Sequence, residues 1–475
     1  MTSYQPTTSH IRSWLLHRFA QVPVPYADVP LDESLVRQLL SGDPRRLSHV
    51  LGVVRTAHEV IGHLGQNAQF VRNLNTAALF HDIGYAPDLR ITGFHPLDGA
   101  LFLAQHGADP EVVTAVLFHT AASSEALSHV EAASHYRELG TQAPSSLLLD
   151  VLTFSDLRTS PSGELITIQE RVGDIANRYG SNHHVTRNIL SQTSYFAQVS
   201  ARVLNVVAQY AAHPLPWLFI DIDDTLVPVG SNISEKSRQA LETYVTRGGR
   251  VSLATGKHPG AIGTLARMLP KGAIHITGNG AVEIRNSGGS SSLLSDFGPY
   301  RTCVTSMLEA LNVPYAIYAL EGIYINSPCV STEHIRILDS IGEPTPMRGE
   351  PDNESSVFKV LSFVDESRKD LEAVLRLKAA KLGVACIRTS RHFIEFMLLG
   401  SSKGAAMAAI LHEAQWPLFH TVAFGDSEND LSMMRRSGLS VAVGNASLAT
   451  CDAADLVVEA CTDDGVAWYV SKLLD

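Results

Sequence analysis

Cysteine is scarce in this chain, and no two cysteines are close together. None of the five forms a Cys-x-x-Cys motif, which argues against zinc ribbons and dithiol redox sites. No apolar run approaches the ~18 residues that span a bilayer. The first residues carry no basic segment followed by an apolar one, so no signal peptide is predicted. We expect a cytoplasmic protein with reduced thiols and no membrane partner.

Basic charge is also in short supply. The 475 residues include 37 Lys and Arg against 48 Asp and Glu, which gives a net charge of -11. Nucleic-acid-binding proteins usually carry a basic surface, so no nucleic-acid partner is expected. An acidic chain suits a protein that gathers carboxylates around metal ions. Its length suggests two or three domains, and 45% hydrophobic residues suffice for ordinary cores.

Residues 1–213 have the sequence pattern of a helical domain. Apolar residues recur at spacings of three and four, as in LVRQLL and VLGVVRTAHEV, and this periodicity is typical of helices packed on one face. Proline and glycine mark the breaks between the helical stretches. The segment His213-Pro-Leu-Pro216 is a candidate linker. We therefore predict an all-α domain over residues 1–213.

From residue 214 on, short apolar runs alternate with helical stretches. The runs WLFID, VSLATG, TVAFGD and LSVAVG are apolar almost throughout, as strands buried on both faces are. This alternation predicts a doubly wound, Rossmann-like α/β domain over residues 214–475. Its core is expected at residues 214–295 and 390–475. Further strand and helix candidates between them predict an inserted α/β cap at about residues 296–389.

Carboxylates follow the first of these strands. In WLFIDIDDTL, Asp221 and Asp223 come where the strand ends, and ligands of open α/β sheets lie beyond the carboxyl ends of strands. A carboxylate at this place can attack phosphorus as a nucleophile. A second carboxylate two residues later can protonate the leaving oxygen. The structural alternative is an acidic strand end whose aspartates cap a helix.

Polar residues follow the later strands in the same manner. They are Thr255 and Gly256 after VSLA, Lys403 in SSKGAA, and Asp426, Asn429 and Asp430 in FGDSENDLSMM. Each alone can be a turn residue, a helix cap or a solvated lysine. Together they indicate a phosphate site, in which a lysine and a metal remove the repulsion between an attacking carboxylate and an anionic phosphate.

Residues 217–475 resemble the haloacid dehalogenase superfamily of phosphatases, and within it the Cof-type group with a large α/β cap. The motifs DIDDTL, LATGK, GNGA, SSKGAA, AFGDSENDLSMM and VGNAS occur in the family's order. One departure is Asp224, where many relatives have glycine. The resemblance implies a phosphatase acting on a small phosphorylated metabolite.

The resemblance also implies individual roles. Asp221 would be the nucleophile, Asp223 the general acid and then base, and Lys403 the cation that offsets charge on the nucleophile and the phosphate. Phosphate or substrate would be bound by Thr255, Gly256, Asn279 and Asn429. Mg²⁺ would be held by Asp221, Asp223, Asp426 and Asp430. For Asn279, and for Glu395 in FIEF, a role in holding the backbone is an open alternative to substrate contact.

Histidines and aspartates in the helical half are spaced as in a metal site. His81 and Asp82 are adjacent at the end of a helical apolar stretch, and further candidates lie before and after them: His49, His95, His119 and Asp156. An isolated His-Asp pair is usually explained by chance or capping. By donor chemistry alone, iron, manganese, zinc or nickel would fit this series. His58 is out of phase with His49 on the same helix and is expected to face away, whereas His63 is nearly in phase.

This series resembles the HD-domain superfamily of metal-dependent phosphohydrolases, over roughly residues 35–205. The resemblance implies one or two divalent transition metals, with Fe or Mn favoured, at the six residues named above. It also implies a nucleotide or related phosphorylated substrate. After Asp156 the sequence departs from the group that splits dinucleoside tetraphosphates. We expect a bifunctional hydrolase; the alternative is an HD module that binds a nucleotide or metal without turnover and gates the phosphatase.

Overall fold

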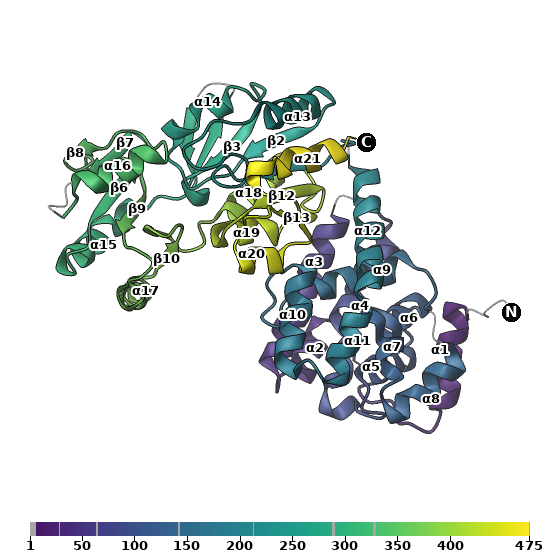
Figure 1. Ribbon diagram of the computed structural model, residues 1–475. Helices are drawn as coiled ribbons and strands as arrows, with labels where there is room; N and C mark the ends of the chain where they lie inside the picture. The colour runs from purple at the N-terminus through teal and green to yellow at the C-terminus, as the bar shows by residue number, and fades with distance from the viewer. Residues whose placement is uncertain are drawn as a thin grey trace. The chain divides into compact units, whose positions relative to one another are not determined.

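The computed structural model describes residues 6–27, 29–62, 65–140, 143–211, 213–286, 290–325 and 329–474. The chain forms two compact units, residues 1–212 and 213–475 (Figure 1). The first unit is helical and the second is α/β with a sheet-rich cap. The fold class predicted from the sequence is therefore confirmed.

The N-terminal unit is built from α-helices joined by turns and loops. Its helices are α1 Thr8–Arg18, α2 Glu33–Leu39, α3 Pro44–Ile61, α4 Ala68–Phe80, α5 His95–Gln105, α6 Pro110–Phe118, α7 Ala122–Ala126, α8 Val130–Leu139, α9 Leu147–Leu157, α10 Ile168–Tyr179, α11 His184–Ser191 and α12 Thr193–Tyr210. Helix α3 begins at Pro44 because the Asp43 side chain accepts a hydrogen bond from the Arg46 amide at 2.9 Å. Helices α3, α4, α6 and α9 pack against one another.

The core of the second unit is a parallel five-stranded sheet in the order β14-β13-β12-β1-β2. Its strands are β1 Trp217–Ile220, β2 Arg250–Leu253, β12 Thr421–Gly425, β13 Leu439–Ala442 and β14 Leu456–Val457. Trp217 is in register with both Thr421 and Arg250. The residues that follow β1, β2 and β12 therefore meet at one edge of the sheet.

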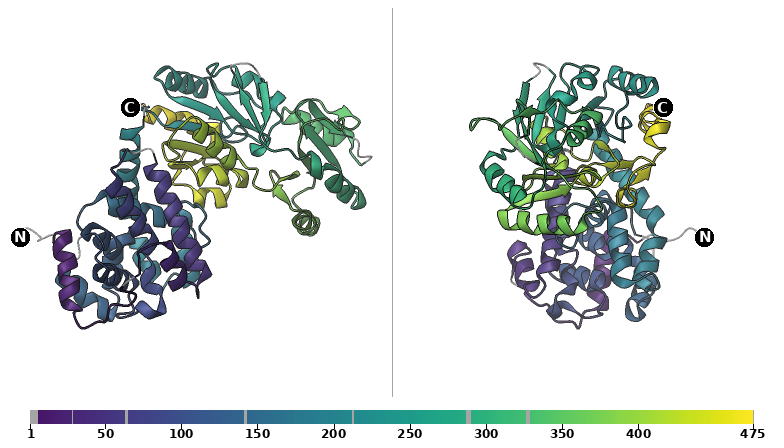
Figure 2. Two further views of the ribbon diagram at one scale, coloured as in Figure 1. Left: turned by 180° about the vertical axis from the view of Figure 1, so that it is seen from behind. Right: turned by 60° about the vertical axis from the view of Figure 1, so that its left-hand side comes forward.

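Helices cover this sheet, and a small antiparallel sheet adjoins it. Helices α13 Glu235–Thr246 and α21 Gly465–Lys472 pack side by side, as do α18 Lys403–Glu413 and α19 Leu431–Met434 (Figures 1 and 2). Two short helices remain, α14 Gly263–Ala266 and α20 Leu448–Ala453. The antiparallel strands are β3 Ile274–Thr277, β4 Val282–Arg285 and β5 Ser290–Leu293. A parallel bridge between Ala254 and Ile276 links β3 to the end of β2.

The cap is a six-stranded sheet in the order β10-β11-β9-β6-β7-β8. Its strands are β6 Tyr315–Ala319, β7 Gly322–Ile325, β8 Met347–Arg348, β9 Val357–Phe363, β10 Val384–Arg388 and β11 Phe393–Leu398; its helices are α15 Gly298–Ala310, α16 Thr332–Ser340 and α17 Lys369–Leu382. Because β11 pairs with both β9 and β10, the cap sheet continues past the expected boundary at residue 389 to Leu398.

No helix in the described part of the chain is both long enough and apolar enough to cross a membrane.

Candidate active sites

Asp221 and Lys403 form a buried ion pair at the carboxyl edge of the core sheet. Asp221 is the first residue after β1, and Lys403 is the first residue of α18, whose N-cap is Ser402. Lys403 Nζ donates to Asp221 Oδ1 at 2.5 Å and to Asp430 Oδ1 at 2.7 Å. The Lys403 side chain is 0% exposed. A solvated lysine, the alternative left open by the sequence, is therefore wrong.

Asp430 and Asp426 complete a group of carboxylates with Asp221. One oxygen from each lies within 4.8 Å of the others. The second oxygen of Asp430 accepts hydrogen bonds from the backbone amides of Asp426 and Ser427 at 3.0 and 3.1 Å. Asp430 is thus both a turn cap and a partner of Lys403. An all-oxygen donor set of this kind fits a hard cation such as Mg²⁺.

The electrostatics of this cluster also fit a cation. Burial raises the pKa of Asp221 well above its usual value, and Asp430 and Asp426 add to the rise while Lys403 opposes it. Burial and the neighbouring Asp430 likewise raise the pKa of Asp426 to about 7. Three carboxylates beside one ammonium group carry excess negative charge, which a divalent ion at this place would neutralise.

Asp223 and Asp224 lie just beyond Asp221 and differ in their surroundings. Asp223 pairs with Lys257 Nζ at 2.9 Å. Burial raises the pKa of Asp223, and Lys257 opposes the rise. Asp224 adopts a left-handed backbone with φ of 58°, a conformation that glycine prefers. Its side chain accepts from the Val229 amide at 3.1 Å and thereby fixes the turn.

The four residues expected to bind phosphate or substrate come from three loops. Thr255 follows β2, and its hydroxyl accepts from the Lys257 amide at 3.2 Å. Asn279 is 2% exposed and left-handed, with φ of 55°. Its amide group lies 3.0 Å from the position that a Cβ on Gly256 would take. Asn429 Nδ2 donates to Asn279 Oδ1 at 3.0 Å, so the three loops are brought together.

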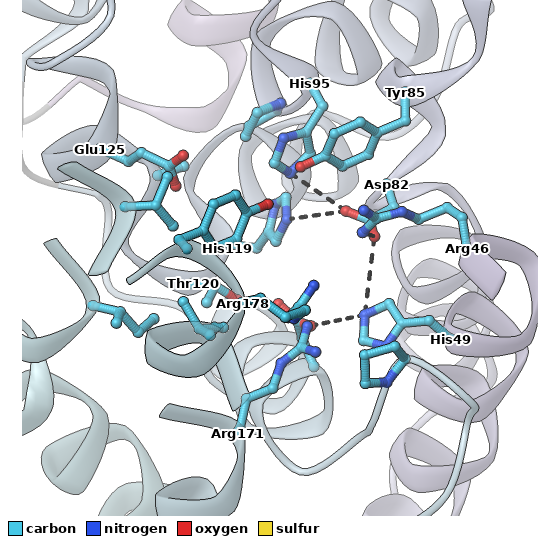
Figure 3. A pocket seen from close by; sticks show the side chains of 18 of the residues that line it. Arg46, His49, Asp82, Tyr85, His95, His119, Thr120, Glu125, Arg171 and Arg178 are labelled. Carbon is cyan, nitrogen blue, oxygen red and sulfur yellow. Dashed lines mark hydrogen bonds and ion pairs between the residues drawn. The ribbon is translucent and has the colours of Figure 1, made fainter. Parts of the chain in front are cut away.

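The N-terminal candidates converge around the carboxylate of Asp82 (Figure 3). Asp82 Oδ1 lies 3.3 Å from His95 Nε2 and 4.0 Å from His119 Nε2. Asp82 Oδ2 lies 3.6 Å from His81 Nε2 and 3.9 Å from His49 Nε2. Two triads that share Asp82 can therefore each hold an ion: His49, His81 and Asp82, and Asp82, His95 and His119.

Backbone carbonyls set the tautomers of the central histidines. The Nδ1 atoms of His49, His81 and His119 lie 3.1, 2.8 and 2.7 Å from carbonyl oxygens. A carbonyl only accepts, so each Nδ1 donates a proton to it and each ring turns its Nε2 toward the centre. His81 Nε2 is buried and has no hydrogen-bond partner among the described residues. This unpartnered nitrogen fits a metal ligand.

Asp156 joins the cluster from α9. Its Oδ1 lies 3.0 Å from His49 Nε2 and 3.3 Å from Arg171 Nη2, and its Oδ2 accepts from the Thr120 hydroxyl. Thr120 and Ala121 both have left-handed backbones. Such strain persists only where the surroundings hold it, and here it brings the Thr120 hydroxyl to Asp156.

The surroundings of the centre favour an ionised Asp82 and a neutral His95. Burial alone would raise the pKa of Asp82, but Arg46, at 2.5 Å, and the histidines hold it well below its usual value. Burial lowers the pKa of His95 to about 3, against the opposing effect of Asp82. Ionised carboxylate and neutral imidazole are the forms that bind metal.

A cavity of about 310 Å³ opens onto this centre. Several of its lining residues were not identified from the sequence; they are Arg45, Arg46, Tyr85, Glu125, Arg171 and Arg178. Arg46 precedes His49 by one helical turn on α3, so helical spacing would have found it. Arg171 and Arg178 lie on α10, outside the histidine and aspartate series, and no sequence signal placed them here.

Two other histidines of the helical half, His58 and His106, do not join the centre. His58 is exposed, as its phase on α3 predicts. His63 lies outside the described residues. His106 hydrogen-bonds to the carbonyls of Phe102 and Tyr26 and so has a packing role.

Comparison with known proteins matches each unit separately. The family model for haloacid dehalogenase-like hydrolases matches residues 218–470, and the model for the HD domain matches residues 46–158. These two models agree with the resemblances drawn from the sequence motifs, which are thereby confirmed. Proteins of both families depend on metals, and the carboxylate and histidine clusters described above are candidate metal-binding groups.

Individual relatives match the C-terminal half. The pyridoxal phosphate phosphatase YbhA of Escherichia coli is 24% identical over 270 residues, which are 53% of this chain and 96% of that protein. The 5-amino-6-(5-phospho-D-ribitylamino)uracil phosphatase YcsE of Bacillus subtilis is 26% identical over 248 residues, 52% of this chain and 91% of that protein. A haloacid dehalogenase-like hydrolase from Bacteroides thetaiotaomicron superposes with a TM-score of 0.49 at 21% identity, over 55% of this chain and 99% of that one.

Proposed function

Because the chain belongs to the haloacid dehalogenase-like hydrolases and acts on phosphate esters, we propose that residues 214–475 hydrolyse a phosphate monoester of a small metabolite through an aspartyl-phosphate on Asp221. The observation that carries this proposal is the buried contact of Lys403 with Asp221 and Asp430 at the sheet edge. We assign residues 1–213 to a second, HD-type centre. The division of the chain into two compact units supports this assignment.

In the first half of the reaction, a carboxylate oxygen of Asp221 bonds to phosphorus while the bond from phosphorus to the leaving oxygen breaks. Asp223 gives its proton to that oxygen. In the second half, water attacks phosphorus, Asp223 takes its proton, and the bond between phosphorus and Asp221 breaks to release phosphate. The raised pKa of Asp223 keeps it protonated, and thus an acid, to higher pH than an ordinary aspartate.

The surrounding groups balance charge. Lys403 lies against the nucleophile, and Thr255, Gly256, Asn279 and Asn429 receive the phosphate and substrate. Mg²⁺ would be held by Asp221, Asp426 and the Asp223 backbone carbonyl, with Asp430 supporting; it supplies positive charge that lets an anionic ester approach an anionic carboxylate.

The relatives support the substrate class. The names of YbhA and YcsE specify pyridoxal phosphate and a phosphoribitylamino-uracil, both of them phosphate monoesters of small metabolites. We propose that this chain acts on a compound of the same class.

For the N-terminal unit, we propose a hydrolytic centre that acts on a nucleotide or a related phosphorylated compound. One or two divalent transition metals, Fe or Mn, would be held by His49, His81, Asp82, His95, His119 and Asp156, and would supply a hydroxide nucleophile near neutral pH. The arginines that line the cavity suit an anionic substrate. In the second candidate function, the same cavity binds a nucleotide without turnover and gates the phosphatase.

Two variants of the full chain test these assignments. Asp221→Asn should abolish the Mg²⁺-dependent hydrolysis of p-nitrophenyl phosphate, since an amide is a poor nucleophile, and full activity in this variant would refute the phosphatase assignment. His81→Ala should remove transition metal, measured by elemental analysis, and leave that hydrolysis intact. Assaying Asp221→Asn against a panel of nucleotides then isolates the N-terminal centre: turnover supports a second enzyme, and saturable binding without turnover supports the gating module.

A further inference from the structure

Two buried, oppositely charged cap residues lie against the phosphate site. Lys359 of β9 and Glu395 of β11 are 1% and 3% exposed, and Lys359 Nζ donates to Glu395 Oε1 at 2.8 Å. We propose that this pair positions the catalytic loops of the core from the cap, so that the cap helps to build the phosphate site. This inference rests on the phosphatase proposed above.

Lys359 holds the loop that follows β2. Its Nζ donates to the carbonyl of Gly256 at 2.7 Å, next to Thr255. It also lies 4.5 Å from the ring centroid of Tyr318, a cation–π contact. The buried ammonium group therefore contacts the Glu395 carboxylate, the Gly256 carbonyl and the Tyr318 ring. The second of these belongs to the backbone of the expected phosphate-binding loop.

Glu395 holds a second loop and, through it, a third. Its Oε2 accepts from Asn279 Nδ2 at 2.8 Å. Asn279 Oδ1 in turn accepts from Asn429 Nδ2 at 3.0 Å, and Asn429 Oδ1 accepts from the Ser427 hydroxyl at 2.6 Å. The series runs from the cap sheet into the loop that carries the metal-site aspartates.

The Glu395 carboxylate determines which atom donates and which accepts at each hydrogen bond of this series. An ionised carboxylate only accepts, so the amide group of Asn279 must turn its Nδ2 toward Glu395 and its Oδ1 toward Asn429. Asn429 must then donate through Nδ2, which leaves the second hydrogen of that NH₂ group for another acceptor. The charge of Glu395 thus sets the orientation of Asn429, a residue we expect to bind phosphate.

Close packing at the same junction leaves little room for the loops to move. A Cβ on Gly278 would lie 2.7 Å from the Phe358 ring of the cap, and one on Gly280 would lie 2.1 Å from the Ser402 carbonyl, next to Lys403. The turn that contains Asn279 is therefore packed tightly between cap strand β9 and the start of α18. Lys359, Glu395 and Asn279 act as positioning residues.

A double apolar replacement separates positioning from stability. Lys359→Met or Glu395→Leu alone leaves a buried charge without its partner and should lower both the melting temperature and kcat. The double variant removes both charges and should recover most of the melting temperature, because buried ion pairs are often replaceable by apolar pairs. Its kcat on p-nitrophenyl phosphate should remain about 10–100-fold below that of the parent, which is the usual effect of losing residues that hold active-site groups in place.

The cap provides a matched control pair. Arg388 and Glu372 lie 2.7 Å apart with side chains 14% and 12% exposed, and they join β10 to α17. The double variant Arg388→Met, Glu372→Leu should keep kcat within about threefold of the parent. If the Lys359 and Glu395 double variant also kept kcat within threefold, the pair would be structural only and the inference would be overturned. An equal fall in both double variants would also overturn it.

Glu395→Gln is the variant to use should the apolar replacements not fold. It preserves shape but adds a donor opposite Asn279, which must then reverse its amide group. We expect a near-parental melting temperature, a kcat at least tenfold lower and weaker inhibition by inorganic phosphate; parental kcat and phosphate inhibition would contradict the proposal. Asp221→Asn is the independent check. If this variant kept its activity, the phosphatase assignment itself would be wrong, and not only the positioning role of Lys359 and Glu395.

Discussion

Replacing Lys403 with methionine tests the electrostatic basis of the phosphatase site. The change keeps an unbranched side chain of similar length but removes an ammonium group 2.5 Å from Asp221 and 2.7 Å from Asp430. Removing one partner of a buried ion pair costs about 3–5 kcal/mol. For a unit of this size, that corresponds to a fall in melting temperature of roughly 6–20 °C.

The stability loss should depend on pH in a definite direction. The pKa of Asp221 is already raised in the folded protein, and loss of Lys403 raises it further. A carboxyl group whose pKa is higher folded than unfolded takes up a proton on folding, so it favours folding least at high pH. The difference in melting temperature between the parent and Lys403→Met should therefore be largest near neutral pH and shrink as the pH falls toward the unfolded pKa of aspartate.

Differential scanning calorimetry and steady-state kinetics measure the two effects. The kcat on p-nitrophenyl phosphate should fall by about 10²–10³, the usual effect of removing one preorganised charge from an active site. Lys378→Met, on the exposed face of α17, is the control and should change neither quantity. A Lys403→Met protein that melts within about 2 °C of the parent at neutral pH and keeps a third of its kcat would refute the reasoning.

Two further variants probe other parts of the phosphatase unit. Asp223→Asn should slow the hydrolysis of alkyl phosphates more than that of p-nitrophenyl phosphate, whose leaving group needs no proton. In the parent, activity should fall as the pH rises through the raised pKa of Asp223, because the acid then loses its proton. The pH–rate profile of the variant should lack this fall at high pH. Equal slowing on both esters would argue against Asp223 as the acid. Gly280→Ala should destabilise the unit by about 2–3 kcal/mol in urea unfolding, since φ is 97° and the new Cβ would meet the Ser402 carbonyl. Gly272→Ala should not, because a Cβ there would have no neighbouring atom within 4 Å among the described residues.

The sequence predicted the parts of the fold that repeat a local pattern. Apolar runs followed by polar residues identified β1, β2 and β12 together with Asp221, Thr255 and Asp426, because a buried parallel strand must be apolar and its ligands must follow it. By contrast, β5 is Ser290-Ser-Ser-Leu293, and nothing in that composition favours a strand. It forms through its antiparallel pairing with β4, a tertiary effect.

The missed site residues have a similar explanation. Lys359 lies in the mostly apolar strand β9, VFKVLSF, and from the sequence alone a lysine there suggests an exposed position at the edge of a sheet. Only the approach of Gly256 and Glu395, each far away in the sequence, makes it a buried cation. Arg171 likewise reaches Asp156 from a helix that has no metal ligand of its own. Spacing along the chain reports local geometry, and these contacts are long-range.

The two candidate metal sites offer different ligand atoms, so the two proposed activities should depend on different ions. One centre offers only carboxylate oxygens, and the other offers imidazole nitrogens around a shared carboxylate. Hard ions such as Mg²⁺ suit the first, and divalent transition metals suit the second. A nitrogen-donor chelator should therefore inhibit the N-terminal centre, and removal of magnesium should inhibit the C-terminal one. Translation delivers both halves in equal amounts. The bifunctional enzyme proposed above would therefore change the ratio of its two activities through the ions around it and not through gene expression.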